Sequence, residues 1–205
     1  MATILGVKVK KIIIYPLGGL SKFQMDYNIH PVKEFFILIS GPIFQFIAFF
    51  LLKRIFPESD RVISIYHYNI LFFNLLPIVP LDGGKLFNIL IESVLPYHFS
   101  KRIMILISYI IVLILIIKNP LSINIIITII WLILLIAKEQ KKIEVIYEKF
   151  LLERFLKNYR FKRIKVITKE KNFYRNKKHI IKQENTTMFE KDYLNKKYKK
   201  IEKSY

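Results

Sequence analysis

Cysteine is absent from the 205 residues. This absence excludes disulfide bonds, iron–sulfur clusters and zinc sites built from thiolates, and it leaves the redox compartment of the protein open. A secretory signal peptide is not apparent either. The chain starts "MATILGVKVKKIII", with its basic residues after a short apolar stretch, which is the reverse of the order in such a signal.

Charged residues are missing from long parts of the chain. A helix of about 20 apolar residues spans the hydrocarbon core of a bilayer, and four such helices in succession are rare in one small soluble domain. The sequence therefore predicts an α-helical multi-pass membrane protein with about four transmembrane helices, rather than four buried helices of a soluble fold. The uncharged segments contain 18, 20, 15 and 19 residues and lie at 35–52, 62–81, 103–117 and 119–137.

Acidic residues are few, and the excess of positive charge is uneven. The chain has 34 Lys and Arg against 15 Asp and Glu, and residues 138–205 alone have 22 against 9. Basic residues beside membrane helices mark the cytoplasmic side, so we expect a cytoplasmic C-terminus. An even number of spans places the N-terminus on the same side. The loop 53–61, which should lie outside, is the weak point because it contains three basic residues.

Proline, glycine and apolar periodicity divide the chain into elements and three domains. Residues 7–29 alternate and then reach Pro16 and Gly18-Gly19, a pattern typical of a strand or hairpin at the membrane. The predicted domains are a membrane-associated strand or hairpin (1–30), a transmembrane core (31–138) and a basic cytoplasmic helix and tail (139–205). The predicted helices are 33–54, 62–81, 101–117, 121–138 and 138–161, with a short re-entrant helix in 83–99, a strand at 179–183 and a last helix at 189–203.

The stretch "FFNLLPIVPLDGGKLF", residues 72–87, combines apolar side chains with a broken backbone and a carboxylate. Pro77 and Pro80 each remove a backbone donor and disfavour helix in the residue before. Asp82 follows at the edge of the span, where an ionisable residue indicates function by default. Gly83 and Gly84 allow a sharp turn or a close approach. These residues alone leave two interpretations open, a functional carboxylate or a helix stop at the interface.

The segment "NLLPIVPLDGG" resembles the N-P-D-G signature of the site-2 protease family of intramembrane zinc metalloproteases, peptidase family M50, in its sporulation branch. Further segments resemble the family in the same order, over roughly residues 7–160. These are "YPLGG" at 15–19, "HPVKEFFILISGP" at 30–42, "YNILFFNLLPIVPLDGG" at 68–84 and "FLLERF" at 150–155.

The resemblance implies a zinc cofactor with Asp82 as one ligand. The residues that it implies for shaping the site or substrate entry are Asn74, Pro77, Gly83, Gly18 and Gly19. It also implies a substrate cut near the cytoplasmic face, namely a membrane-associated protein such as a sporulation sigma-factor precursor. The implied partners are membrane lipid, that substrate and regulatory membrane proteins.

The family's H-E-x-x-H motif does not occur in these 205 residues. It would supply two histidine ligands and a glutamate base on one helical face. The four histidines are His30, His67, His98 and His179; none has a second histidine four residues away, and each is expected to be structural or interfacial. No catalytic residue is assigned in this chain. Because the predicted strand begins almost at residue 1, we expect Met1 to be an internal methionine, with one or more spans missing before it.

Two other functions fit parts of the sequence. A non-catalytic membrane homologue would bind substrate or partner proteins without cleaving them. A membrane-anchored protein with a basic tail at 138–205 would bind anionic lipid or nucleic acid. The tail contains no recognisable nucleic-acid module, so a nucleic-acid partner is not expected.

Overall fold

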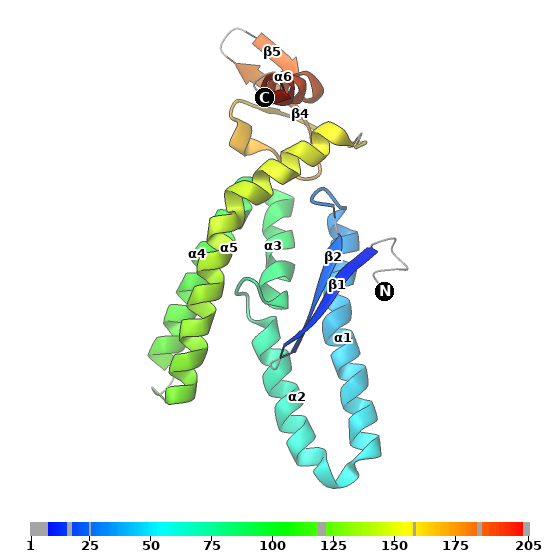
Figure 1. Cartoon of the computed structure of the whole chain (residues 1–205), viewed down its shortest axis with the longest axis vertical. Coiled ribbons are helices and arrows are strands. Elements are labelled where there is room, and N and C mark those ends of the chain that lie inside the picture. The colour runs from blue at the N-terminus through cyan, green and yellow to red at the C-terminus, as the bar shows by residue number, and fades with distance from the viewer. Residues whose placement is uncertain are drawn as a thin grey trace. The chain divides into compact units, whose positions relative to one another are not determined.

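The computed structural model describes residues 8–15, 18–24, 26–118, 122–157, 159–183 and 186–202 (Figure 1). The chain divides into two compact units, Met1–Leu71 and Phe72–Tyr205, and each is described by itself. Pro16, which the sequence places in the turn of the hairpin, lies outside the described residues. Residues 1–7, at the start of the predicted hairpin region, also lie outside them.

The first unit contains a hairpin and a long helix. Strands β1 (Lys8–Tyr15) and β2 (Gly18–Gln24) pair antiparallel, with Tyr15 opposite Gly18 and Ile14 opposite Gly19. This is the hairpin that the alternating pattern predicts. Helix α1 (Pro31–Ile55) begins with a proline at its first position, where the missing N–H costs nothing, and the His30 side chain accepts a hydrogen bond from the Val32 N–H.

Helix α2 (Asp60–Leu75) follows the short 3-10 turn η1 (Pro57–Ser59). The sequence prediction that this helix extends to residue 81 was wrong. The helix ends at Leu75 because the Pro77 and Pro80 nitrogens cannot donate to the preceding turn. Residues 76–81 form a loop instead, so the break in the backbone starts six residues earlier than expected.

Three helices follow the loop: α3 (Asp82–Val94), α4 (Tyr97–Lys118) and α5 (Ile123–Leu156). Helix α3 ends before Pro96, since the residue that precedes a proline avoids helical backbone. The prediction of two separate helices meeting at residue 138 was wrong, because α5 is one helix of 34 residues. Its junction contains no proline or glycine, and lysine, glutamate and glutamine favour helix, so the change in charge does not end it.

The tail forms a small α/β layer beyond α5. It contains β3 (Ile164–Ile167), the turn η2 (Glu170–Asn172), β4 (Lys178–Gln183), β5 (Thr186–Phe189) and α6 (Glu190–Glu202). Strand β4 pairs parallel with β3 and antiparallel with β5. The predicted strand and last helix are present as β4 and α6. Strands β3 and β5 were missed because they are four residues long and partly polar.

The second unit has an apolar core between its helices and another in the tail. Ile78 of the loop is fully buried among residues of α4 and α5. The helix core consists of Ile78, Ile105, Val112, Ile129, Leu132, Ile136 and Ile143. The largest buried apolar side chains of the tail region are Tyr147, Phe150, Phe173, Ile181 and Leu194.

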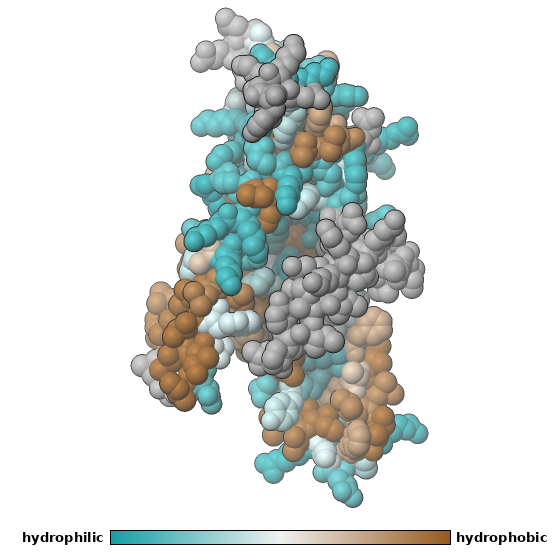
Figure 2. Space-filling view, in the orientation of Figure 1, coloured by the Kyte–Doolittle hydropathy of each residue, from teal (hydrophilic) through white to brown (hydrophobic). Residues whose placement is uncertain are grey.

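Helices α1, α4 and α5 are each long and apolar enough to cross a membrane, and α2 has 16 residues. Only 17–28% of the residues in their apolar windows are buried, as expected for helices with side chains that face lipid. Within the second unit, Figure 2 shows hydrophobic residues over the ends of α4 and α5 that are far from the tail, and mainly hydrophilic residues over the tail. The described part of the chain thus has three candidate spans, where the sequence predicted about four.

Candidate metal site at the start of helix α3

The loop between α2 and α3 is fixed by hydrogen bonds that replace those of a helix. The Ile78 N–H donates to the Leu76 carbonyl at 2.7 Å, and the Leu81 N–H donates to the Ile78 carbonyl at 2.8 Å. The Val79 N–H donates to the Ser108 hydroxyl of α4 at 3.0 Å. Because Ile78 also packs into the core, the loop is attached firmly to α4 and α5.

The two glycines of the motif lie against the backbone of this loop. A Cβ atom on Gly83 would be 2.1 Å from the Leu75 carbonyl oxygen and 2.6 Å from that of Leu76. A Cβ on Gly84 would be 2.4 Å from the Ile78 carbonyl oxygen. The Leu75 and Leu76 carbonyls are those that lose their helical donors when α2 breaks. The first turn of α3 therefore approaches these carbonyls so closely that only glycine fits.

Asp82 is the first residue of α3. Its Oδ1 accepts a hydrogen bond from the Lys85 Nζ at 2.9 Å, and 36% of its side chain is exposed. A carboxylate at this position is stabilised by the helix dipole, which is a sufficient structural reason for an aspartate here. It is also accessible enough to coordinate a cation, so its geometry is compatible with the metal-ligand hypothesis.

The other predicted site residues fall into two places. Asn74 lies in the last turn of α2 and Pro77 in the loop, and both are half-buried. Together with Asp82 and Gly83 they form the corner between α2 and α3. Gly18 and Gly19 begin β2, where they pair with Tyr15 and Ile14. They belong to the first unit, whereas the corner belongs to the second.

A complete catalytic zinc site needs three protein ligands and an open position. Among the residues that the structure describes, no group of three or more histidine, aspartate or glutamate side chains could hold a metal ion. The described side chains at this corner thus offer one carboxylate and do not by themselves fit a catalytic zinc.

Each histidine lies in a structural contact. Besides His30, which caps α1, the His67 ring stacks on Phe49 with ring centroids 4.1 Å apart. His98 Nε2 lies 2.9 Å from a carboxylate oxygen of Glu144. His179 is fully buried in the tail, with its Nδ1 3.0 Å from Glu190. These contacts agree with the structural or interfacial roles expected from the sequence.

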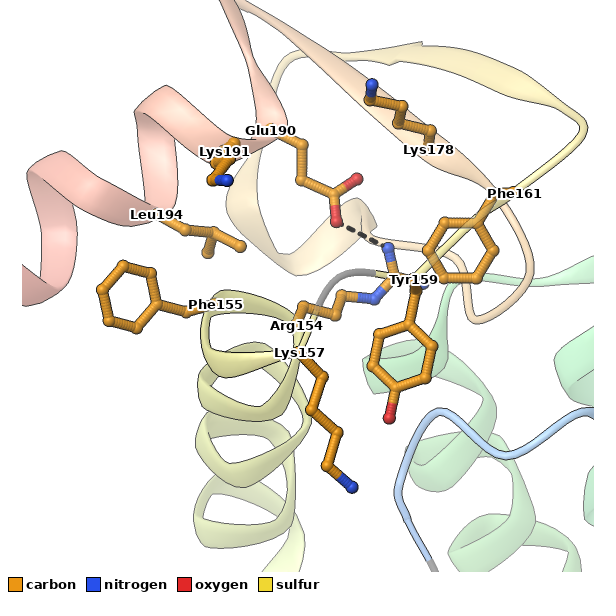
Figure 3. Close-up of a pocket in the computed structure, with 9 residues that line it drawn as sticks. All are labelled: Arg154, Phe155, Lys157, Tyr159, Phe161, Lys178, Glu190, Lys191 and Leu194. Atoms are coloured by element: carbon orange, nitrogen blue, oxygen red, sulfur yellow. Dashed lines mark hydrogen bonds and ion pairs between the residues drawn. The ribbon is translucent and has the colours of Figure 1, made fainter.

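A cavity of about 120 Å³ lies in the tail, at the end of α5. Figure 3 shows Arg154 reaching across it to Glu190 of α6, and the ion pair measures 2.8 Å. The Arg154 guanidinium also lies over the Phe161 ring, 4.5 Å from its centroid. The sequence singles out the segment FLLERF at 150–155, which contains this arginine, but it does not show that Arg154 is buried or that its partner is Glu190.

The region that contains this corner is similar to known proteins. Residues 61–117 match Peptidase family M50, a region that contains nearly all of α2, the loop, α3 and nearly all of α4. Stage IV sporulation protein FB of Bacillus subtilis is 30% identical over 165 residues, which is 76% of this chain and 57% of that protein. A zinc metalloprotease of Methanocaldococcus jannaschii is 31% identical over 147 residues, which is 66% of this chain and 42% of that protein.

The chain spans about half the length of these two relatives. The matched region includes the candidate ligand Asp82, the loop that precedes it and the two glycines that follow it. Three apolar helices agree with an integral membrane protein. The chain is therefore similar to peptidase family M50, the site-2 protease family of membrane metalloproteases, over the region that contains this corner.

Proposed function

We propose that this protein is an intramembrane zinc metalloprotease of the site-2 type, which cleaves a membrane-associated protein near the cytoplasmic face. The observation that carries the proposal is the position of Asp82. It is an accessible carboxylate at the start of α3, directly after a broken membrane helix, inside the region that matches family M50. Ionisable groups at such positions in membrane proteins are usually functional.

Asp82 would contribute one ligand to the zinc, and Asn74, Pro77 and Gly83 would shape the site around it. Gly18 and Gly19 would contribute the glycine turn of the hairpin. In such proteases a bound zinc lowers the pKa of its water and polarises the peptide carbonyl. Asp82 alone cannot hold that zinc, since two further ligands and a general base are needed.

The proposal includes a topology and partners. The helices α1, α2, α4 and α5 would be four spans with both termini in the cytoplasm, between a hairpin region at 1–30 and a basic tail at 139–205. The substrate would be a membrane-associated protein such as a sporulation sigma-factor precursor. The similarity to a sporulation protein supports a substrate that acts in sporulation, and regulatory membrane proteins are proposed as further partners. The span faces would contact membrane lipid.

A second candidate is a non-catalytic member of the family that binds the same class of substrate. It is favoured by the absence of an H-E-x-x-H motif from these 205 residues and by the single carboxylate at the corner. The two candidates differ in cleavage and in bound zinc.

The test is cleavage by the product of the complete reading frame, expressed with a sigma-factor precursor as substrate. Asp82→Asn keeps the size and hydrogen-bonding capacity of the side chain but removes its charge. We expect it to lower cleavage at least 100-fold and to reduce the zinc content of the purified protein, while membrane insertion is retained. Asp60→Asn is the matched control, because Asp60 also begins a helix and pairs with a lysine, Lys53, at 2.7 Å.

Unchanged cleavage by Asp82→Asn would show that Asp82 is not a ligand. A wild-type protein that inserts and binds the precursor but neither cleaves it nor contains zinc would favour the non-catalytic candidate.

A further inference from the structure

Glu92 is a carboxylate buried at the other end of the helix that begins with Asp82. The whole Glu92 residue is 3% exposed, and its side chain is fully buried. Three donors surround it. Arg175 Nη1 lies 2.6 Å from Oε2, and Lys101 Nζ at 2.8 Å and Asn88 Nδ2 at 2.6 Å lie near Oε1. Burial alone would raise the pKa of Glu92, but attraction to Lys101 and Arg175 lowers it below its ordinary value.

These contacts join three parts of the second unit. Glu92 and Asn88 belong to α3, Lys101 belongs to the first turns of α4, and Arg175 comes from the tail between η2 and β4. The backbone of the tail docks at the same place, because the Tyr97 N–H donates to the Phe173 carbonyl at 2.8 Å. The tail therefore contacts the end of α3 through a buried ion pair and the start of α4 through its main chain.

Arg175 is itself held in place by Arg154 of α5. The Arg154 guanidinium donates to the carbonyls of Tyr174 at 2.7 Å, Arg175 at 2.5 Å and Lys177 at 3.0 Å. It also pairs with Glu190, the first residue of α6, across the cavity seen in Figure 3. The loop that carries Arg175 is thus fastened to α5 and α6, so the position of its side chain depends on the folded tail.

Helix α3 connects this anchor to the candidate ligand. Asp82 precedes Glu92 by ten residues, which is about 15 Å along a helix axis. At the Asp82 end, Gly83 and Gly84 fit against the loop backbone. At the other end, the buried ion pair fixes the helix, and a buried charge that loses its partner is strongly unfavourable. A short helix held at both ends cannot tilt or rotate without breaking one of these contacts.

We propose that Arg175 is a positioning residue for the motif helix: through Glu92 it fixes α3 from the tail, and thereby sets where Asp82 lies. This proposal rests on the function proposed above for Asp82. It makes the tail part of the machinery of the site, because any event that displaces the 173–175 loop removes the Arg175 contact from the distal end of α3 and leaves Lys101 as the one cationic partner described for Glu92.

The test is hydrogen exchange of the full chain in nanodiscs, with Arg175→Gln. We expect backbone amides in residues 86–94 to exchange at least tenfold faster, while amides of β4 keep the wild-type rate. Arg175→Lys keeps the charge and should restore part of the protection. Arg102→Gln is the matched control, since it removes an exposed arginine–glutamate contact, with Glu144 at 3.0 Å, and should leave α3 unchanged.

If Arg175→Gln unfolds the tail, Glu92→Gln provides a second test, because it removes the charge of the other member of the ion pair, which belongs to α3. The double variant Glu92→Gln/Arg175→Gln should exchange no faster than the faster single variant, as expected for two residues that act through one contact. Wild-type exchange of α3 in Glu92→Gln, or in Arg175→Gln with β4 protected, would overturn the proposal.

Cleavage by the complete reading frame provides the functional measurement. A positioning role predicts that Arg175→Gln lowers kcat at least tenfold with little change in KM, and that Arg175→Lys recovers part of kcat. An unchanged kcat in a variant with faster α3 exchange would also overturn the proposal. A wild-type protein without cleavage would refute the proposed function instead, and the exchange experiment would still decide whether the tail fixes α3.

Discussion

The imidazole of His179 is buried between two partners that determine its protonation state. The Tyr174 N–H donates to Nε2 at 2.9 Å, so Nε2 must be unprotonated. The proton on Nδ1 can then be donated to Glu190, 3.0 Å away. Burial lowers the pKa of His179, and this effect outweighs the contact with Glu190, which favours the charged form. The folded tail therefore requires a neutral histidine.

This requirement predicts a pH dependence of tail stability. The pKa of His179 in the folded protein lies below its ordinary value of 6.5, so below about pH 6.5 the unfolded chain binds more protons than the folded chain. The stabilisation is fully present above pH 6.5 and is lost as the pH falls toward the folded pKa. We expect the temperature of the unfolding midpoint of the tail to decrease as the pH is lowered from 7.5 to 5.5.

The matched variant is His179→Gln, which retains an acceptor and a donor but does not titrate. Its midpoint should be lower at pH 7.5 and should change less over the same range. Equal slopes for the wild-type protein and the variant would contradict the assignment.

At the residue scale, the sequence could single out Asp82 as a candidate ligand but gave no sign of the contacts of Glu92, Arg175 or His179. Asp82 is part of a local motif, so its neighbours in sequence are also its surroundings. Glu92 and Arg175 are 83 residues apart, and nothing next to either residue in the sequence indicates that the fold brings them together.

At the scale of elements, the contact between α3 and the preceding loop depends on Gly83. In a helix, alanine in place of glycine normally stabilises by about 0.5–1 kcal/mol. Here the added Cβ would overlap the Leu75 carbonyl oxygen, so α3 would have to move. We expect Gly83→Ala to destabilise the protein by about 1–3 kcal/mol instead, as overpacking does. Thermal unfolding in detergent would measure this.

Ser93→Ala serves as the control, because Ser93 is an exposed residue of the same helix. A Gly83→Ala variant as stable as the control would show that α3 does not approach the loop as closely as described.

The elements themselves were predictable where local rules determine them. His30-Pro31 marks the start of α1, and Pro96 limits α3. The continuity of α5 was not predictable from the change in composition at Lys138. An apolar helix in lipid and a charged helix in water have the same backbone, and only a proline or glycine would have separated them. The close contact of Gly83 also required the structure, because the motif indicates glycine without showing what approaches it.

At the scale of the whole molecule, the proposed topology can be tested with single cysteines, because the chain has none of its own. Glu58 and Lys169 are both exposed, in η1 and just before η2. With both termini cytoplasmic, a membrane-impermeant maleimide should label Glu58→Cys in intact cells. It should label Lys169→Cys after the membranes are broken. The unmodified chain is the control, and labelling of Lys169→Cys in intact cells would contradict the topology.

The tail packs beside α5 from Glu144 onward, where Lys171 contacts the Glu144 carboxylate at 3.3 Å. Glu144 is six residues after Lys138, about 9 Å along the helix. Electrostatic screening in physiological salt acts over about 8 Å, so the near edge of the tail lies about one screening length from the end of the apolar segment. The surface charge of a membrane at the end of the apolar segment would thus reach this edge of the tail attenuated by salt, and a lower ionic strength would strengthen its effect.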